Sequence, residues 1–185
     1  TILIHLGMTG KIIIIDSSNI KHKSSFYFKI KDNDPKHDHV IFKFDNNIKF
    51  IYNDVRKFGF IKIYELNHIK RISHLNNLGP EPFEKKWNFK YFKDYIINRK
   101  RNIKNILMDQ KFVSGLGNIY VNEILFLSGV RPSRVVKKLE NFEIEKIIKY
   151  SKIILKDSIK LGGSTIKDFS SENGKKGVFQ QYFKI

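Results

Sequence analysis

Cysteine is absent from the 185 residues of this chain, which excludes disulfide bonds and thiolate metal ligands within it. Proline and tryptophan are rare, with four copies and one copy. No apolar run approaches the roughly 20 residues that a membrane-spanning helix needs. No basic segment followed by an apolar one resembles a secretory signal. We therefore expect a soluble, cytoplasmic protein.

Acidic residues are few: 18 Asp and Glu stand against 35 Lys and Arg, a formal net charge of +17. This excess favours a polyanionic partner, and nucleic acid before a membrane surface. The chain is also rich in Lys, Ile and Asn, as an AT-rich genome would make it, so the charge supports nucleic-acid binding without proving it. Hydrophobic residues make up 41% of the chain, enough for a core, and the length suits one large or two small domains.

The most informative stretch, 103–128, has the pattern of a helix, a tight glycine turn and a second helix. Gly115 and Gly117 give the turn a backbone freedom that other residues lack, and Asn118 stands at the expected cap of the second helix. Gly129 and Pro132 are expected to end that helix. Apolar residues at helical spacing mark the two helices: Ile103, Ile106, Leu107, Tyr120, Ile124 and Leu127.

Such a turn leaves backbone N–H groups pointing outward at the start of the second helix, and with the helix dipole they favour an anion. Lys104 and Lys111 add positive charge nearby. In a chain this basic, a nucleic-acid phosphate is the expected anion. The alternative is an ordinary helical hairpin whose glycines only allow close packing, and the spacing alone favours neither.

The remaining pattern indicates an α+β fold. Short apolar or alternating runs predict antiparallel strands at 11–16, 25–30, 40–44, 48–52 and 59–64. Helical spacing then predicts helices, the last at about 142–161. We expect a partial antiparallel β-sandwich at 1–66, a linker at 67–82, a helical domain at 83–161, and a polar loop with a following strand pattern at 162–185.

Five motifs, in this order along the chain, resemble those of the formamidopyrimidine-DNA glycosylases, which are bacterial base-excision repair enzymes. They are His5-Leu-Gly-Met-Thr-Gly10, Lys36-His-Asp-His-Val40, Asp54-Val-Arg-Lys-Phe-Gly59, the stretch from Met108 to Glu123, and Gly162-Gly-Ser-Thr165 with Phe179-Gln180; Leu78-Gly-Pro-Glu-Pro82 also fits. The resemblance covers essentially the whole chain. It identifies the central stretch as a helix-two-turn-helix.

The resemblance implies DNA contacts from both halves of the chain. Met8, Arg56 and Phe58 match a wedge that fills the gap left when a base swings out of the duplex. The guanidinium fork of Arg56 would read the orphaned opposite base. The other implied DNA contacts are His5, His37, Lys57, Lys104, Lys111 and Asn118, of which the first and the last bind phosphate.

Several of these residues have a plainer interpretation. Taken alone, Met8 would more often be a core methionine. His37 and His39 could hold a metal ion, although a third and a fourth ligand are not apparent. The second turn departs from the family pattern at Val55, where proline is usual, and at Lys57, where arginine is usual. Lysine keeps the charge but loses bidentate geometry.

The polar segment after the last helix matches the family's lesion-capping loop, whose backbone grips the extruded oxidised purine. The loop would become ordered only when DNA is bound. A linker without a binding role fits the same glycines and charges. The matching residues are Ser164, Thr165, Ile166, Lys167, Asp168 and Phe169.

The catalytic groups of the family have no match in these 185 residues. The family's nucleophile is an N-terminal proline amine that forms an imine with the sugar, aided by a following glutamate and a hairpin lysine. These groups and the four-cysteine zinc finger would lie outside the chain. Both ends of the sequence fall in strand-like segments, so we expect the interior of a longer protein. These 185 residues are expected to bind damaged DNA without turnover and to hold no zinc.

For the complete protein, the resemblance implies a monomeric glycosylase and abasic-site lyase that acts on oxidised or ring-opened purines in duplex DNA. Two alternatives stay open: a non-catalytic DNA-binding module derived from the family, and a sister glycosylase specific for pyrimidines. Intact flanking coding sequence would discard the first. Comparing excision of oxidised guanine and oxidised thymine would separate the second, although the wedge and the long loop favour purines.

Overall fold

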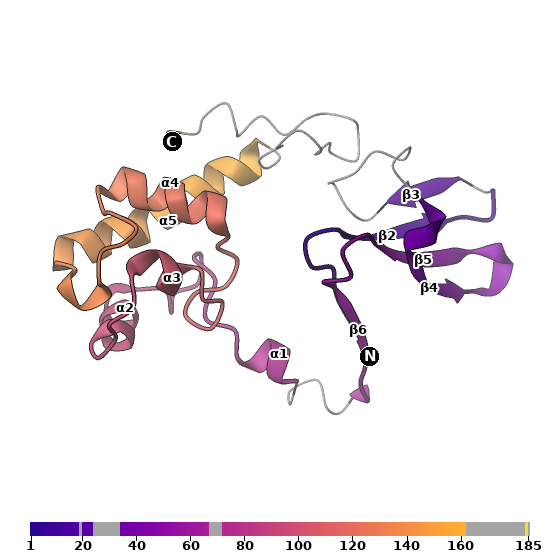
Figure 1. Ribbon diagram of the computed structural model, residues 1–185, viewed down its shortest axis with the longest axis horizontal. Helices are drawn as coiled ribbons and strands as arrows, with labels where there is room; N and C mark the ends of the chain where they lie inside the picture. The colour runs from indigo at the N-terminus through magenta and orange to yellow at the C-terminus, as the bar shows by residue number, and fades with distance from the viewer. Residues whose placement is uncertain (19, 24–33, 67–71, 162–183, 185) are drawn as a thin grey trace. The chain divides into compact units, whose positions relative to one another are not determined.

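The computed structural model describes residues 1–18, 20–23, 34–66, 72–161 and 184. The described residues form two compact units, one from 1–66 and one from 72–161 with 184. Strands make up the first unit and helices the second, so the predicted α+β class is confirmed (Figure 1). The strand predicted at 25–30 lies outside the described residues.

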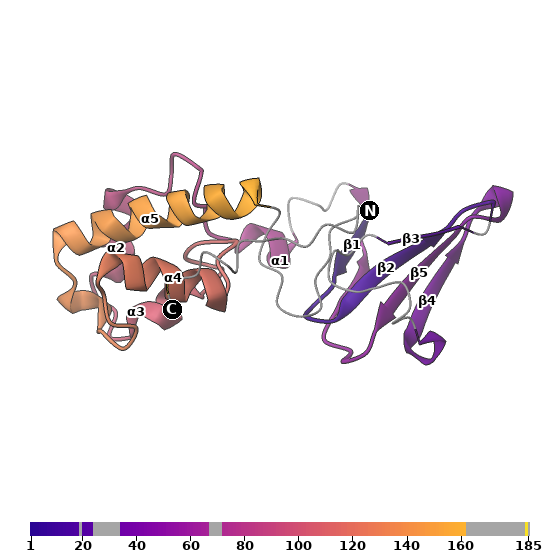
Figure 2. The same ribbon diagram turned by 90° about the horizontal axis from the view of Figure 1, so that it is seen from above.

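The first unit contains two antiparallel sheets. The strands β1 (Ile2–His5) and β6 (Phe60–Ile63) form a two-stranded sheet. The larger sheet has the order β3-β2-β5-β4, seen side by side in Figure 2, and consists of β2 (Gly10–Ile15), β3 (Lys21–Lys23), β4 (Asp38–Lys43) and β5 (Lys49–Asp54). Among the side chains that the structure describes in this sheet, the buried apolar ones lie on its two central strands: Ile12, Ile13, Ile51 and Tyr52.

Two short 3-10 helices adjoin β4, one on each side of it. The first, η2, spans Pro35–His37, and the second, η3, spans Asp45–Asn47. Asn46 and Asn47 adopt φ values of 61° and 60°, a left-handed conformation that asparagine tolerates better than most residues. The chain therefore reverses at these asparagines between β4 and β5, which pair antiparallel.

The second unit is helical, with α5 packed along α4 (Figures 1 and 2). The helices are α1 (Ser73–Asn76), α2 (Phe89–Ile96), α3 (Ile103–Leu107), α4 (Asn118–Ser128) and α5 (Asn141–Lys160), with a 3-10 turn η5 (Val136–Lys138). The single turn α1 lies in the stretch expected to be a connector. Gly129 ends α4 in the left-handed conformation, with φ 71°, as predicted.

The core of this unit is partly aromatic. Trp87 matches the helical spacing of the sequence but precedes α2, because the Asn88 side chain accepts a hydrogen bond from the Tyr91 N–H and caps the helix there. The buried Trp87 indole donates to Ser151 Oγ on α5 at 3.0 Å. Phe112, also buried, packs against Trp87 with ring centroids 5.2 Å apart. This cluster fixes the segment that leads from α3 into the glycine turn.

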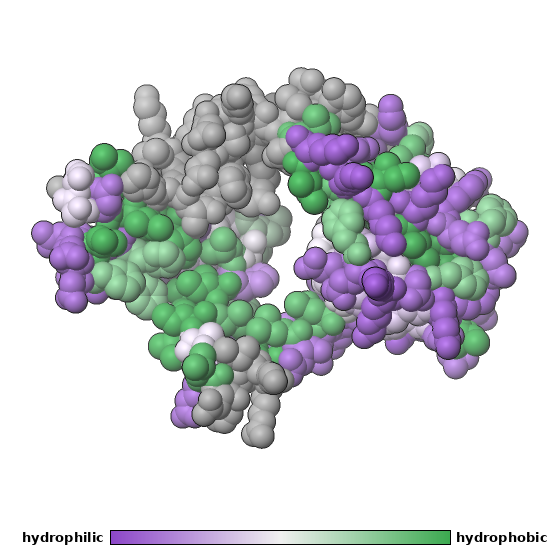
Figure 3. Space-filling model, turned by 180° about the vertical axis from the view of Figure 1, so that it is seen from behind, coloured by the Kyte–Doolittle hydropathy of each residue, from purple (hydrophilic) through white to green (hydrophobic). Residues whose placement is uncertain are grey.

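Charged and polar residues dominate the face of the helical unit visible in Figure 3. Among the described residues, no helix combines the length and the apolar character needed to cross a membrane.

Candidate nucleic-acid interface

Two turns of the first unit lie side by side because of strand register. His5 pairs with Phe60 at one end of the turns, and Gly10 pairs with Asp54 at the other. The residues between these pairs, 6–9 and 55–59, are thereby held against each other. A Cβ on Gly7, which has φ 61°, would lie 2.8 Å from the backbone of Phe58, so the approach requires glycine there.

Met8, Arg56 and Phe58 meet on the exposed side of these turns. Met8 is 70% exposed and Phe58 57% exposed, although both are large and apolar. The Arg56 Nη1 donates to the Met8 sulfur at 3.4 Å, and the Arg56 guanidinium carbon lies 4.4 Å from the Phe58 ring centroid. The structure thus brings together the three residues predicted to form a wedge. We call these three residues the plug.

A buried carboxylate lies beneath the plug. Asp54 is fully buried, and its two oxygens accept from the Thr9 hydroxyl, the Tyr52 hydroxyl at 3.0 Å, the Gly59 N–H at 2.9 Å and the Arg56 N–H at 3.2 Å. Burial alone would raise the pKa of Asp54, but these hydrogen bonds outweigh it and hold the pKa below its usual value of 3.8. The carboxylate therefore stays charged and organises both turns.

Tyr52 belongs to the same network. Burial, and then its hydrogen bond to Asp54, raise the pKa of Tyr52 to about 12, so its hydroxyl remains a donor at neutral pH. Sequence reasoning missed Asp54, Thr9 and Tyr52 as functional residues. The available signal was an aspartate at the end of a strand and the start of a turn, a place where carboxylates often bind backbone N–H groups.

The predicted histidines differ in their surroundings. His5 is exposed, accepts from the Gly7 N–H at 3.1 Å through Nδ1, and stacks on Phe60 with centroids 5.3 Å apart. His37, half-buried, ends η2. His39 Nε2 is 2.8 Å from the backbone oxygen of Asp54. The part of the chain that the structure describes has no group of three or more side chains able to hold a metal ion.

Lys57, between two plug residues, adopts a left-handed backbone with φ 57° and is exposed. Such a conformation is unfavourable for a lysine, so the surrounding contacts must hold it. The left-handed backbone at Lys57 therefore indicates that the hydrogen bonds to Asp54 hold this turn in one conformation.

The glycine turn of the second unit is braced by the side chain of Gln110. Its Oε1 accepts from the Gly115 N–H at 2.9 Å, and its Nε2 donates to the Leu116 oxygen at 2.8 Å. Gly115 has φ 83°, which favours glycine. The Gln110 backbone oxygen also accepts from the Gly79 N–H at 2.8 Å, which ties the turn to the Leu78–Pro82 segment.

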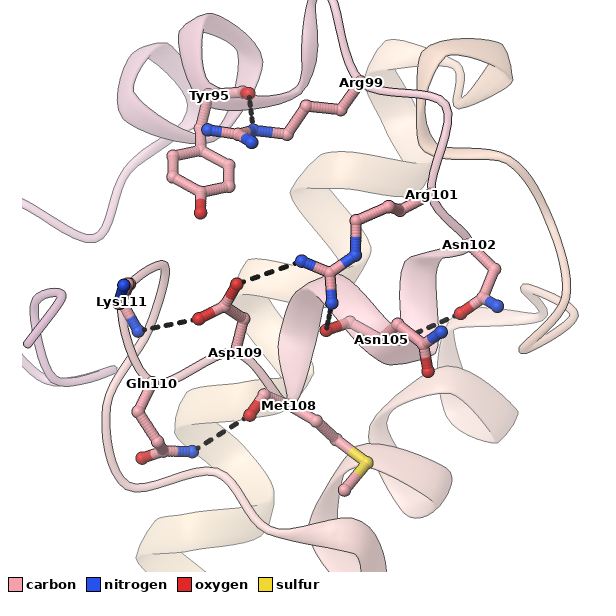
Figure 4. Close-up of polar contacts among 9 residues, drawn as sticks. All are labelled: Tyr95, Arg99, Arg101, Asn102, Asn105, Met108, Asp109, Gln110 and Lys111. Atoms are coloured by element: carbon pink, nitrogen blue, oxygen red, sulfur yellow. Dashed lines mark hydrogen bonds and ion pairs between the residues drawn. The ribbon is translucent and has the colours of Figure 1, made fainter.

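The start of this turn has its own polar contacts, shown in Figure 4. Asp109 accepts from the Lys111 N–H at 3.1 Å and pairs with the Arg101 guanidinium at 3.1 Å. Lys111 is exposed and Lys104 half-buried. The Lys104 N–H donates to the Pro132 oxygen at 3.3 Å, so this amide near the start of α3 is already used within the protein.

The prediction that Asn118 caps the second helix is wrong by one residue. Gly117 is the cap, with an extended backbone at φ −110° and ψ 176°, and Asn118 is the first residue of α4. Glycine has no side chain to bind the first amides of the helix, and no side-chain cap is present. Asn118 is exposed, so its side chain and the start of α4 face outward together.

The segment predicted to cap a lesion, Ser164 to Phe169, lies outside the described residues.

Comparisons with known proteins agree with the family resemblance over both units. A family model described as the formamidopyrimidine-DNA glycosylase N-terminal domain matches residues 1–61, and one described as the H2TH domain of the same enzyme matches residues 78–170. The formamidopyrimidine-DNA glycosylase of Wolbachia pipientis subsp. Culex pipiens (strain wPip) is 38% identical over 184 residues, 100% of this chain and 62% of that protein. The enzyme of Oceanobacillus iheyensis is 43% identical over 146 residues, 79% of this chain and 52% of that protein.

Solved structures give the same result. The crystal structure of a Lactococcus lactis FPG mutant with a Fapy-dG containing DNA has a TM-score of 0.77 at 30% identity, covering 99% of this chain and 62% of that one. The complex of Lactococcus lactis Fpg with an abasic site containing DNA also has a TM-score of 0.77, at 31% identity and the same coverages. This chain thus spans 62% of the length of the Wolbachia relative and of both structures. It belongs to the formamidopyrimidine-DNA glycosylase family.

Proposed function

We propose that the complete protein removes oxidised or ring-opened purines from duplex DNA and cleaves the resulting abasic site through an imine intermediate. The observation that carries this proposal is the plug of Met8, Arg56 and Phe58, which stands exposed on two braced turns. An exposed thioether and an aromatic ring suit the gap left by an extruded base. The partners named for the Lactococcus lactis structures, DNA with Fapy-dG or an abasic site, fit the same role.

The two units would divide the work of binding. In the first, Arg56 would read the orphaned base, with His5, His37 and Lys57 as further DNA contacts. In the second, Asn118 and the first amides of α4 would bind a phosphate, because a helix N-terminus without a capping side chain attracts anions. Lys104 and Lys111 would add positive charge there. Ser164 to Phe169 would cap the lesion.

Catalysis would depend on groups beyond these 185 residues. We propose that the family's proline nucleophile, its glutamate and its lysine lie outside this chain, together with the zinc finger. Four cysteines would be needed for that finger and the chain contains none, so its residues do not fit a zinc site of this type. The complete protein would act as a monomer on DNA in the cytoplasm.

The first test is covalent trapping. Borohydride reduces an imine to a stable adduct, so the complete protein is expected to be trapped on duplex DNA that contains oxidised guanine. The 185-residue chain is expected to bind an abasic-site analogue but to give no trapped adduct. An adduct with this chain alone would contradict the assignment of catalysis to other residues.

The second test concerns the plug. Arg56→Ala is expected to reduce the preference for cytosine over adenine opposite an abasic-site analogue by about 1–3 kcal/mol, the usual discrimination from one bidentate base contact. Lys43→Ala is the matched control, because Lys43 carries the same positive charge and is exposed but lies at the far end of the β4–β5 ladder from Asp54. If both variants kept the wild-type preference, the plug would not read the opposite base.

A further inference from the structure

Asp54 is placed where it organises the plug without touching anything outside the protein. Its side chain is fully buried at the end of β5, and its carboxylate oxygens are occupied by donors from both turns. A group with no exposed surface cannot contact DNA directly. Its effect must therefore pass through the residues that it holds.

Thr9 is the point where the two turns are joined. Its hydroxyl donates to Asp54 Oδ1 and accepts from the Arg56 N–H at 3.1 Å. Met8 precedes Thr9, so one hydroxyl links the residue next to Met8 to the backbone of Arg56, 47 positions later in the chain. A threonine hydroxyl has one hydrogen to donate and two lone pairs to accept with. Here the hydrogen goes to Asp54, and one lone pair accepts from the Arg56 N–H.

The plug needs such support because no core packing holds it. Met8 and Phe58 are mostly exposed, and their described contacts run to Arg56. Exposed side chains on a mobile turn would lose conformational entropy when they enter DNA, which lowers affinity and blurs discrimination. The unfavourable left-handed backbone at Lys57 adds a further reason for bracing.

We infer that Asp54 and Thr9 are positioning residues that hold Met8, Arg56 and Phe58 together as one preformed plug, and that this sets opposite-base discrimination. The inference rests on the proposed function of the plug. It assigns specificity to two residues that would make no contact with DNA. Pre-organisation of this kind acts through residues whose own positions are fixed by hydrogen bonds.

The test compares Thr9→Val with Thr9→Ser in the complete protein. Valine keeps the shape of threonine but removes the hydroxyl, whereas serine keeps the hydroxyl. Thr9→Val is expected to lower the ratio of affinities for cytosine and adenine opposite an abasic-site analogue by roughly five- to tenfold, the effect of losing a hydrogen bond or two. Thr9→Ser is expected to keep the wild-type ratio. The salt dependence of binding should be unchanged in both, because no phosphate contact is lost.

Each outcome decides the inference. If Thr9→Val kept the ratio, or if Thr9→Ser lost it as well, the hydroxyl would not position the plug. If Thr9→Val melts well below the wild type, Thr9→Ala takes its place. Alanine removes the same hydroxyl without placing an extra methyl group against Asp54, and the ratio of affinities in Thr9→Ala then decides the inference. Arg56→Ala distinguishes a failure of the proposed function from a failure of this inference. If the Arg56→Ala variant keeps the wild-type ratio of affinities, the proposed function of the plug is overturned. If Arg56→Ala lowers the ratio of affinities but Thr9→Val keeps it, only the positioning role of Thr9 and Asp54 is overturned.

Discussion

Gly59 lies where the two turns of the first unit come closest, and its missing side chain is what allows the approach. A Cβ there would lie 2.0 Å from the Tyr52 hydroxyl oxygen and 2.4 Å from the His5 backbone oxygen. Both distances are far below ordinary van der Waals contact. The Gly59 N–H also donates to Asp54. One residue thus meets a steric demand and a hydrogen-bonding demand at the same position.

Gly59→Ala is therefore expected to destabilise the protein by about 1–3 kcal/mol or more, as overpacking of a filled site does. The clash involves backbone of β1, which cannot rotate away. Gly117→Ala is the matched control, because a Cβ there would meet nothing within 4 Å. Urea denaturation of both variants measures the difference, and equal midpoints would refute the steric account.

The charge of Asp54 gives a second prediction at this scale. Its pKa is lower in the folded chain than the ordinary value of 3.8, because hydrogen bonds from Thr9, Gly59, Tyr52 and Arg56 outweigh burial. Its charged form therefore stabilises the fold above about pH 4, and this contribution disappears as the pH falls through the lower folded pKa. Asp54→Asn should cost a constant amount of stability between about pH 5 and pH 8.

Below the ordinary pKa the wild type should lose its advantage over Asp54→Asn. Urea midpoints of the two proteins, measured across the acid range, are expected to converge as the pH falls. A gap that widened toward acid would mean that the folded pKa is raised and that burial dominates.

At the scale of elements, the turn between α3 and α4 depends on one side chain that belongs to neither helix. Gln110 accepts from the Gly115 N–H and donates to the Leu116 oxygen, so it closes the turn from both directions. Gly117, which caps α4 without a side chain, follows directly. The direction in which the first amides of α4 point is therefore set by Gln110 as well as by the glycines.

Gln110→Ala is expected to loosen this turn and to weaken DNA binding by up to about thirtyfold on every duplex, because two hydrogen bonds worth about 1 kcal/mol each are lost. Opposite-base preference should be unchanged, since the plug belongs to the other unit. Asn105→Ala, at an exposed position of α3, is the control. Fluorescence anisotropy on matched and lesion-containing duplexes gives both quantities, and a selective loss on one opposite base would contradict the prediction.

At the scale of the whole molecule, the charge of +17 is spread far more widely than the candidate contacts. Only those basic groups that neutralise phosphates release counterions, and each contributes about 0.9 to the slope of log affinity against log salt concentration. The slope therefore counts contacts, whereas the net charge does not. This separates functional charge from charge that composition alone produced.

Lys104→Ala is accordingly expected to reduce the salt slope by about 0.9 and to weaken binding on all sequences alike. Lys149→Ala, on the exposed side of α5, removes the same charge and is expected to leave the slope unchanged. Titrations at several salt concentrations measure both. Equal slopes for the two variants would mean that Lys104 contributes only to the general field.

Much of the fold was predictable because its signals are local. Alternation and β-branched runs located β2, β4, β5 and β6 to within a residue or two, and apolar spacing located α4 and α5. Two helix boundaries differ from the pattern: Trp87 has the helical spacing but precedes α2, and Asn118 begins α4 where it was expected to cap it. In both places a neighbour took the capping position, a choice that depends on backbone angles and not on spacing.

The sequence by itself determined the kind and order of most elements, though not β3 or α1, together with the glycine turns, the basic excess and the family motifs, because periodicity, turn chemistry and charge act over a few residues. The family motifs predicted that Met8, Arg56 and Phe58 form one wedge, but only the tertiary structure gives their contacts and shows that Asp54, Thr9 and Tyr52 brace them. Thr9 and Arg56 are 47 positions apart, and the register of β2 on β5 and of β1 on β6 brings them together. A shift of one residue in either ladder would turn these side chains to opposite faces.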